Sequence, residues 1–263
     1  GYLQGGFGLI TNLDDSTVQD LHAASRRPTP PKITLNCYLV DTGDERILID
    51  TGLGALVGDE GARLEAGLSE MRLSRADIDR VILTHSHPDH LGGLIDSDDK
   101  PVFPQAEIWV PAGELAFWRG AVPADASDML RNQFASAQRV FDACAANLRS
   151  IEKDEIRPGI TRYPIPGHTP DHSGYRIASN GESLLIAADI VHLPQIQFPR
   201  PDAHVMFDTD PARAVRSRQA LFAEVAESGE PIAGHHIDFP GIGYVVADGD
   251  GYRFLPHVWS PFV

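Results

Sequence analysis

The sequence predicts an α/β fold. Short apolar runs typical of strands alternate along the chain with segments whose apolar residues recur at helical spacing. The first half begins with strands and continues through helices, and the second half returns to strands, one long helix and further strands. This order suggests two similar halves packed together in an α/β architecture.

The first half of the chain alternates regular elements with polar loops. Thr42-Gly43-Asp44-Glu45 separates two strands and is typical of a hairpin. Ser74-Arg75-Ala76-Asp77 resembles a capping box that opens a short helix. The predicted strands cover residues 33–41, 46–50, 80–83 and 107–110, and the predicted helices cover 16–24, 62–71, 112–119 and 126–148.

The second half contains the clearest turn and cap signals. Asn180-Gly181 predicts a hairpin between two strands, and Asp210-Pro211 predicts the start of a helix that ends near Ser228. Asp248-Gly249-Asp250 lies between the last two predicted strands. The predicted strands cover residues 160–165, 175–178, 183–187, 231–234, 243–247 and 251–255.

The composition limits the classes of function. The chain has 263 residues, of which 42% are apolar and 22% charged, as expected for one large buried core. We expect an irregular N-terminal arm over residues 1–31 and a single domain over 32–263. The formal net charge of −15 argues against a nucleic-acid partner, because binding to phosphates needs clustered Lys and Arg. No apolar run approaches the roughly 20 residues of a membrane span, so we expect no membrane partner.

The compartment and the assembly are weakly determined. A soluble chain in the cytoplasm or the periplasm fits the composition, and a homodimer stays open. The sequence begins at Gly1 without a Met, so a removed leader also stays open. Cys37 and Cys144 form no motif, which suggests neither a disulfide framework nor a thiolate metal site.

The strongest local signal lies directly after the apolar run at 81–83. Residues 84–93 are Thr-His-Ser-His-Pro-Asp-His-Leu-Gly-Gly, so His85, His87, Asp89 and His90 fall within six residues. A turn at the end of a strand aims such side chains at one point. Imidazole nitrogen and carboxylate oxygen are ligands of zinc and its neighbours in the transition series. The sequence therefore predicts a metal site at this turn.

Further candidate ligands follow other predicted strands. His168, Asp189 and either His235 or His236 each stand at the C-terminal end of a strand. Strand ends on one rim of a sheet converge, so these side chains can meet the first turn. Two metals fit this inventory if one carboxylate bridges them.

These motifs resemble the metallo-β-lactamase-fold superfamily. His-Ser-His-Pro-Asp-His, Gly-His-Thr-Pro, Ala-Asp and Gly-His-His occur in the family's order and spacing, and the match runs from about residue 33 to 259. The resemblance implies a four-layer αβ/βα sandwich with a dinuclear site on one edge. It implies that one metal is bound by His85, His87 and His168, the other by Asp89, His90 and the last His, with Asp189 bridging. Asp50, in Asp-Thr-Gly, matches a carboxylate that orients a ligand.

The C-terminal segment is similar to the branch that contains methyl parathion hydrolase and lactonases. In that branch the metal-binding His stands three residues before Phe-Pro-Gly, which indicates His236, with His235 as the alternative. The family's homoserine-lactone lactonases place a Tyr shortly after the bridging Asp, whereas this chain has Val191 and His192. A second departure is Asp171, where relatives often have Gly.

The resemblance implies a hydrolase that acts on a small-molecule substrate and binds two divalent ions. We expect zinc first, with manganese, cobalt and iron as alternatives. A bridging hydroxide would attack the carbonyl carbon or phosphorus of an uncharged ester, lactone or phosphotriester. Asp189 would bridge the metals, and Asp89 would also accept a proton. The alternatives are a di-iron redox member and a nucleic-acid- or thioester-processing hydrolase of the same fold. The net charge argues against nucleic acid, and the chain lacks room for the flavin domain of the redox members.

The substrate pocket is the least determined part of the site. Candidates for its wall are Phe7, Trp109, Trp118, His192 and Phe198. Packing in the core is the alternative for the aromatic residues, and a structural hydrogen bond is the alternative for His192. We expect His172 and His204 to be structural.

Overall fold

A computed structural model describes residues 2–54, 56 and 63–258. The chain divides into two compact units. Unit 1 comprises Cys37–Lys153, and unit 2 combines Tyr2–Asn36 with Asp154–Val263. Each unit contains a sheet and helices, which confirms the α/β class. The assignment of residues 32–263 to a single domain stays a prediction.

The sheet of unit 1 has the order β3-β4-β5-β6-β7. Its strands are β3 (Tyr38–Asp41), β4 (Arg46–Ile49), β5 (Arg80–Ile82), β6 (Glu107–Pro111) and β7 (Leu148–Ile151). β3 and β4 form the predicted hairpin, and β4 to β7 run parallel. Ile47, Leu48 and Ile49 are all buried, as expected for a parallel strand covered on both faces.

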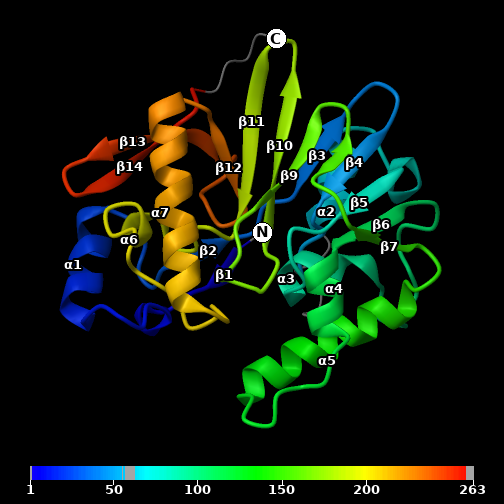
Figure 1. The fold of residues 1–263 in the computed structure, drawn as a ribbon, viewed down its shortest axis with the longest axis horizontal. Helices are drawn as coiled ribbons and strands as arrows, with labels where there is room; N and C mark the ends of the chain where they lie inside the picture. The colour runs from blue at the N-terminus through cyan, green and yellow to red at the C-terminus, as the bar shows by residue number, and fades with distance from the viewer. Residues whose placement is uncertain (1, 55, 57–62, 259–263) are drawn as a thin grey trace. The chain divides into compact units, whose positions relative to one another are not determined.

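The helices of unit 1 are α2 (Arg63–Glu70), α3 (Pro88–Leu91), α4 (Ala112–Trp118) and α5 (Asp128–Ala143). α5 lies next to α3 and α4 (Figure 1). Its apolar side chains, including Phe134 and Phe141, enter the same core as Val81 and Ile108 of the sheet. Ala62, expected to begin α2, lies outside the described residues.

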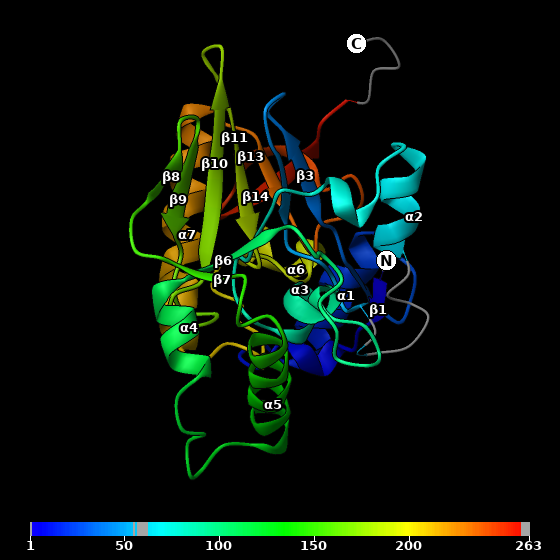
Figure 2. The same cartoon turned by 90° about the vertical axis from the view of Figure 1, so that its right-hand side faces the viewer.

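The main sheet of unit 2 has the order β14-β13-β12-β11-β10-β9-β8. All neighbouring pairs are antiparallel except β11 and β12. Its strands are β8 (Glu155–Arg157), β9 (Ile160–Pro164), β10 (Ser173–Ser179), β11 (Glu182–Ala188), β12 (Ile232–Gly234), β13 (Ile242–Asp248) and β14 (Gly251–Pro256). The order β8, β9, β10 along one side of the sheet is visible in Figure 2. β10 and β11 form the hairpin predicted at Asn180-Gly181, and β13 and β14 form a hairpin around Gly249.

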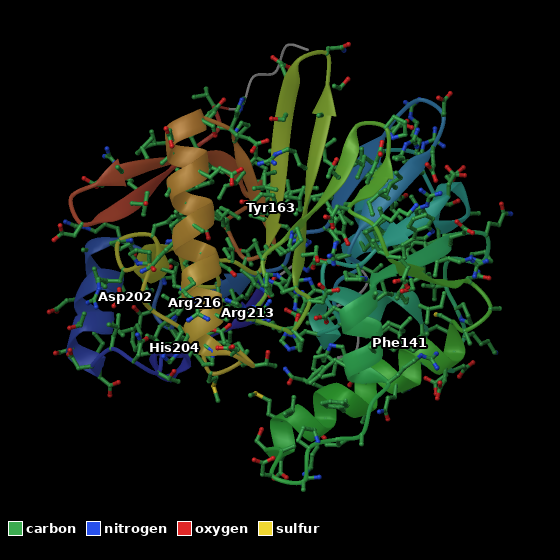
Figure 3. The ribbon with its side chains drawn as sticks, in the orientation of Figure 1. Phe141, Tyr163, Asp202, His204, Arg213 and Arg216 are labelled. Atoms are coloured by element: carbon green, nitrogen blue, oxygen red, sulfur yellow. The ribbon has the colours of Figure 1, made fainter. Side chains whose placement is uncertain are left out.

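The long helix α7 (Pro211–Ser228) packs on this sheet. It begins as predicted: the side chain of Asp210 accepts a hydrogen bond from the Arg213 N–H at 2.9 Å. Figure 3 shows Arg213 and Arg216 in the first half of the helix. Leu221, Phe222 and Val225 on its inner face form a core with the sheet residues Leu185 and Ile232.

The N-terminal residues are more regular than the expected arm. They form β1 (Tyr2–Gln4), a 3-10 turn (Phe7–Leu9) and α1 (Asp15–Ala24), and β1 pairs with β2 (Lys32–Thr34). α1 matches the predicted helix and packs against the short helix α6 (Pro194–Gln197). Their apolar side chains, including Val18, Leu193 and Ile196, form a separate core cluster.

Two predicted elements were too long. The strand expected over 33–41 is divided between β2 and β3, because Asn36 turns to the segment after β12. Its side-chain amide donates to the carbonyls of Gly234 at 3.0 Å and Ile237 at 2.7 Å. The helix expected to reach 148 ends at Ala143, and the following residues pair with β6 as β7. The pattern also did not predict β1, β8, α3 or α6. Among the described residues, no helix is long and apolar enough to span a membrane.

Candidate metal centre

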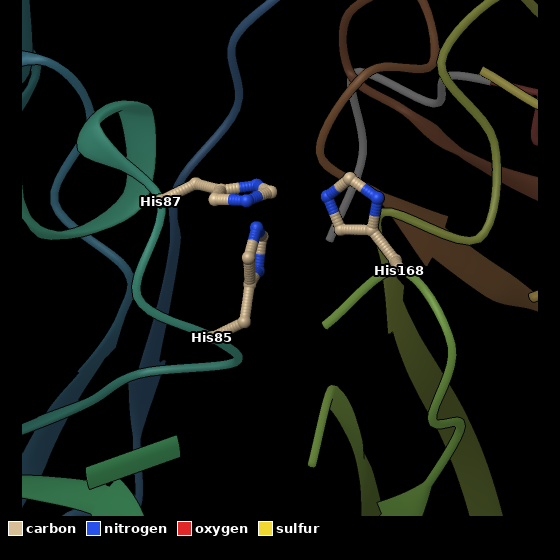
Figure 4. Close-up of side chains that lie close together, drawn as sticks. All are labelled: His85, His87 and His168. Atoms are coloured by element: carbon tan, nitrogen blue, oxygen red, sulfur yellow. The ribbon is translucent and has the colours of Figure 1, made fainter. Parts of the chain in front are cut away.

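The histidine-rich turn of unit 1 connects β5 to α3. His85, His87 and His90 are all buried. The His85 ring centroid lies 4.6 Å from that of His87 and 4.0 Å from that of His90. Figure 4 shows the His85 and His87 imidazoles close together on this turn. The structure therefore gathers the three histidines of the motif within unit 1.

Asp50 binds this turn from the end of β4. It is fully buried, and its carboxylate accepts hydrogen bonds from the N–H of Thr84 at 2.8 Å and its hydroxyl at 2.7 Å. Oδ2 of Asp50 also lies 2.6 Å from Nδ1 of His90. The carboxylate therefore holds the His90 ring with Nδ1 as the hydrogen-bond donor.

Nε2 of His90 faces a second carboxylate. It lies 3.7 Å from Oδ2 of Asp89, whose side chain is 19% exposed. Both Thr51 N–H and the Thr51 hydroxyl donate to the His90 carbonyl at 2.8 Å. A Cβ at Gly93 would collide with the backbone of Thr51, which explains why glycine follows the histidines.

In unit 2, His168 lies in the loop after β9 and is also drawn in Figure 4. Its Nδ1 lies 2.8 Å from Oδ1 of Asp208, and its Nε2 lies 3.5 Å from Oδ2 of Asp189. Gly167 adopts a φ of 132°, and a Cβ there would collide with the backbone of Ala214 at the start of α7. The loop is thus pressed against the helix, and Asp208 fixes the ring that it carries.

Asp189 follows β11 and is the centre of the unit 2 cluster. Its Oδ2 lies 2.8 Å from Nε2 of His236, 3.3 Å from Nε2 of His192 and 3.5 Å from Nε2 of His168. Ligand atoms of His168, Asp189 and His192 lie within 4.8 Å of one another. The Asp189 backbone N–H donates to Nε2 of His172, whose Nδ1 lies 3.0 Å from the Ile165 carbonyl. These bonds give His172 the structural role expected from the sequence.

The geometry favours His236 over His235 as a partner of Asp189. Nδ1 of His236 lies 2.7 Å from the Thr34 carbonyl, while its Nε2 faces Asp189. A ring fixed through Nδ1 by a carbonyl is the usual arrangement of a metal-binding histidine. The ligand role of either histidine stays a proposal.

One pattern recurs at His90, His168 and His236. Each ring has an oxygen acceptor at Nδ1, from Asp50, Asp208 or Thr34, and a carboxylate oxygen beyond Nε2. A neutral imidazole has one N–H, so it cannot donate to acceptors on both sides. A cation between Nε2 and the carboxylate would satisfy the imidazole lone pair and the carboxylate oxygen at the same time. The nitrogen and oxygen donors suit zinc and similar divalent metals, so the residues fit the metal implied by the sequence.

The cysteines do not contribute a thiolate. Burial, followed by the negative charge of Asp50, raises the pKa of the Cys37 thiol. Burial raises the pKa of Cys144 to about 11. Since only a deprotonated thiol binds metal well, histidine and carboxylate remain the relevant donors.

The aromatic candidates for the pocket wall mostly pack inside their own units. Trp118 is fully buried between Phe134 and the His87 ring. Phe198 is 2% exposed and stacks on Phe222 and Phe254. These contacts indicate core packing, which was the alternative left open by the sequence.

The other candidates differ in their surroundings. Trp109 donates to Glu107 at 3.0 Å and lies under the guanidinium of Arg80 at 4.2 Å, a surface arrangement on the sheet. Phe7 contacts the His22 ring within the N-terminal cluster. His192, by contrast, lies against Asp189. Its pocket role stays a prediction.

Sequence reasoning missed two carboxylates. Asp208, which holds His168, comes 40 positions later in the chain. Glu114 is fully buried and accepts the Ser86 N–H between His85 and His87. The acidic residue inside an otherwise apolar helical turn was the available signal for Glu114. Asp208 belongs to the Phe207-Asp208 pair of the segment that is similar to the methyl parathion hydrolase branch, but the sequence did not connect it to His168.

Comparison with known proteins agrees with these motifs. Residues 34–233 match the family model described as the metallo-beta-lactamase superfamily. A probable metallo-hydrolase of Mycobacterium bovis is 26% identical over 190 residues, which cover 60% of this chain and 57% of that protein. The match thus spans little more than half the length of that relative.

Solved structures extend the similarity to nearly the whole chain. The dizinc quorum-quenching lactonase AidC, in complex with a product, is 26% identical with a TM-score of 0.94, covering 99% of this chain and 92% of that one. The hydrolase AbOPH is 27% identical with a TM-score of 0.90 and the same coverage. With a family model matched over most of its length, the chain belongs to the metallo-beta-lactamase superfamily.

Proposed function

We propose that the chain is a dinuclear-metal hydrolase that cleaves an uncharged ester, lactone or phosphotriester. The observation that carries this proposal is the pattern at His90, His168 and His236, where Nδ1 is held by an oxygen and Nε2 faces a carboxylate. A structural histidine needs one such partner. An oxygen at both nitrogens is expected where a cation belongs between the ring and the carboxylate.

The proposed ligand set is the one that the sequence motifs imply. One metal would be held by His85, His87 and His168, and the other by Asp89, His90 and His236, with Asp189 shared. Seven nitrogen and oxygen donors suit two zinc ions, with manganese, cobalt or iron as alternatives. A bound dinuclear centre supplies a nucleophilic water at neutral pH and an electrophile for the substrate's reacting oxygen.

The chain's own residues would orient and move protons at this centre. Asp50, Asp208 and the Thr34 carbonyl keep Nε2 of three histidines as the metal-facing atom. Asp89, whose side chain is 19% exposed, would accept a proton as the reaction proceeds. His192, which lies 3.3 Å from Asp189, is a candidate for contact with the substrate.

The substrate is expected to be uncharged, and a lactone is the first candidate. The net charge of −15 disfavours anionic substrates through long-range repulsion. The similarity to a dizinc lactonase covers 99% of the chain. Aryl esters and phosphotriesters share the same chemistry of attack on an electrophilic centre, so they belong in the same test.

The test combines metal analysis with a substrate panel. Protein stripped by a chelator would be reloaded with zinc, manganese, cobalt or iron, and kcat/KM would be compared for lactones, aryl esters and phosphotriesters. We expect two divalent ions per chain and activity that returns with the metal. Asp189→Ala should lose both, whereas Asp202→Ala, in a half-exposed ion pair with Arg200, should keep both. Two irons with no turnover of any substrate in the panel would refute the hydrolase and favour a redox protein.

A further inference from the structure

Glu114 is a buried carboxylate that the proposed reaction does not use. It lies in the first turn of α4 and is 0% exposed. Burying a carboxylate is costly unless hydrogen bonds compensate it. The residues that it contacts therefore indicate what its position achieves.

Two N–H groups converge on one oxygen of Glu114. The backbone N–H of Ser86 donates to Oε2 at 3.1 Å, and the indole N–H of Trp118 donates to the same atom at 2.8 Å. Ser86 stands between His85 and His87, so the first bond fixes the backbone that carries both imidazoles.

The second bond also leads to the histidine turn. The Trp118 ring meets the His87 ring edge to face, with centroids 5.6 Å apart. Phe117 and Phe134 hold the indole from other sides at 5.0 and 4.8 Å. Glu114 thus constrains the turn through its backbone at Ser86 and through the indole packed against His87.

We propose that Glu114 is a positioning residue that presets the His85–His87 pair for metal binding. This inference rests on the proposed function, because it assigns Glu114 to the metal site of that reaction. A preset site loses less conformational freedom when it binds metal. A substitution at Glu114 should therefore lower the affinity for the metal more than it lowers the stability of the fold.

The chain offers a matched control on β6, the strand directly before α4. Glu107 on β6 also accepts an indole N–H, from Trp109 at 3.0 Å, but its side chain is 42% exposed and pairs with arginines. Glu107→Gln removes the charge from a carboxylate–indole pair whose other contacts are Arg80 and Arg149. Glu114→Gln replaces the carboxyl group of the buried pair by an amide. Glu114→Asp keeps the carboxyl group on a side chain that is one methylene shorter.

The experiment measures zinc affinity by competition with a chelator, the visible spectrum of the cobalt-loaded protein and the unfolding midpoint of the metal-free protein. We expect Glu114→Gln and Glu114→Asp to raise the zinc Kd roughly 10–100-fold and to change the cobalt spectrum, with Glu107→Gln unchanged. If Glu114→Gln does not fold, Glu114→Asp decides alone. A lower unfolding midpoint with wild-type zinc Kd and cobalt spectrum would show a packing role and overturn the inference. A wild-type protein that binds no divalent metal would instead refute the proposed function.

Discussion

Replacing Asp50 by Asn tests whether the proposed metal site depends on the tautomer of His90. The carboxylate accepts three hydrogen bonds, two from Thr84 and one at Nδ1 of His90. Asn has one acceptor oxygen and an NH2 group in the same volume. With the oxygen toward the Thr84 N–H, the NH2 faces His90, which must then carry its hydrogen on Nε2. That atom is the proposed metal ligand, so its lone pair is lost.

The opposite orientation of the amide lowers the stability of the fold and leaves the tautomer of His90 unchanged. Its oxygen then serves His90, and the NH2 faces the Thr84 N–H, a donor left without an acceptor in a fully buried place. A lost hydrogen bond to a charged group costs about 1.5–3 kcal/mol of stability. Loss of a residue that orients a metal-binding histidine typically costs about 10–100-fold in affinity, or about 1.4–2.7 kcal/mol. Stability and metal affinity therefore report different orientations of the amide.

The assay measures bound zinc and its Kd by chelator competition, together with the urea midpoint of the metal-free protein. We expect Asp50→Asn to weaken the binding of one of the two zinc ions and to lower activity in parallel. The matched control is Asp41→Asn, since Asp41 on β3 also accepts a backbone N–H, from Gly43 at 2.8 Å, but contacts Arg46 rather than an imidazole. An Asp50→Asn protein with two zinc ions at wild-type affinity and a wild-type urea midpoint would refute the reasoning.

Three further outcomes follow from single contacts. Asp208→Ala should weaken metal binding roughly 10–100-fold, because it removes the acceptor at Nδ1 of His168, and an unchanged zinc Kd would contradict this. Arg218→Met should lower stability by about 3 kcal/mol, and the melting temperature by roughly 6–12 °C, since the buried guanidinium donates to backbone carbonyls between 190 and 203. Burial raises the pKa of Cys144 to about 11, so at pH 8 DTNB should react with it roughly 200-fold more slowly than with an unperturbed thiol until urea unfolds the protein.

The candidate ligands could be found in the sequence because each follows a short apolar strand. His85 to His90 come directly after β5, and Asp189 directly after β11. Strand ends are local features that periodicity reveals. The choice between His235 and His236 was harder, because neighbouring residues differ only in the direction of their side chains. The contact of His236 with the Thr34 carbonyl favours one of them.

The supporting residues could not be found in the same way. Asp208 meets His168 across 40 positions, and Glu114 meets Ser86 across 28. Such pairs depend on how distant elements pack, which no local pattern records. The same limit explains why Trp118 and Phe198 were candidates for the pocket wall although they pack in the core. An aromatic residue that faces the core and one that faces a pocket have the same local sequence pattern. The strand at 33–41 was overextended for a related reason: Asn36 bonds to carbonyls about 200 positions away.

In both units, a residue with left-handed backbone lies at the strand end that carries a carboxylate. Asp50 at the end of β4 adopts a φ of 59°, and Ala188, directly before Asp189 at the end of β11, adopts a φ of 47°. Left-handed backbone at a residue other than glycine costs on the order of 1 kcal/mol and persists where the surroundings fix it. Asp50 is fixed by its bonds to Thr84 and His90, and Asp189 by the bond from its N–H to His172. In each unit the chain thus accepts local strain at the strand end that carries a carboxylate facing imidazole, which is where a rigid ligand geometry is needed.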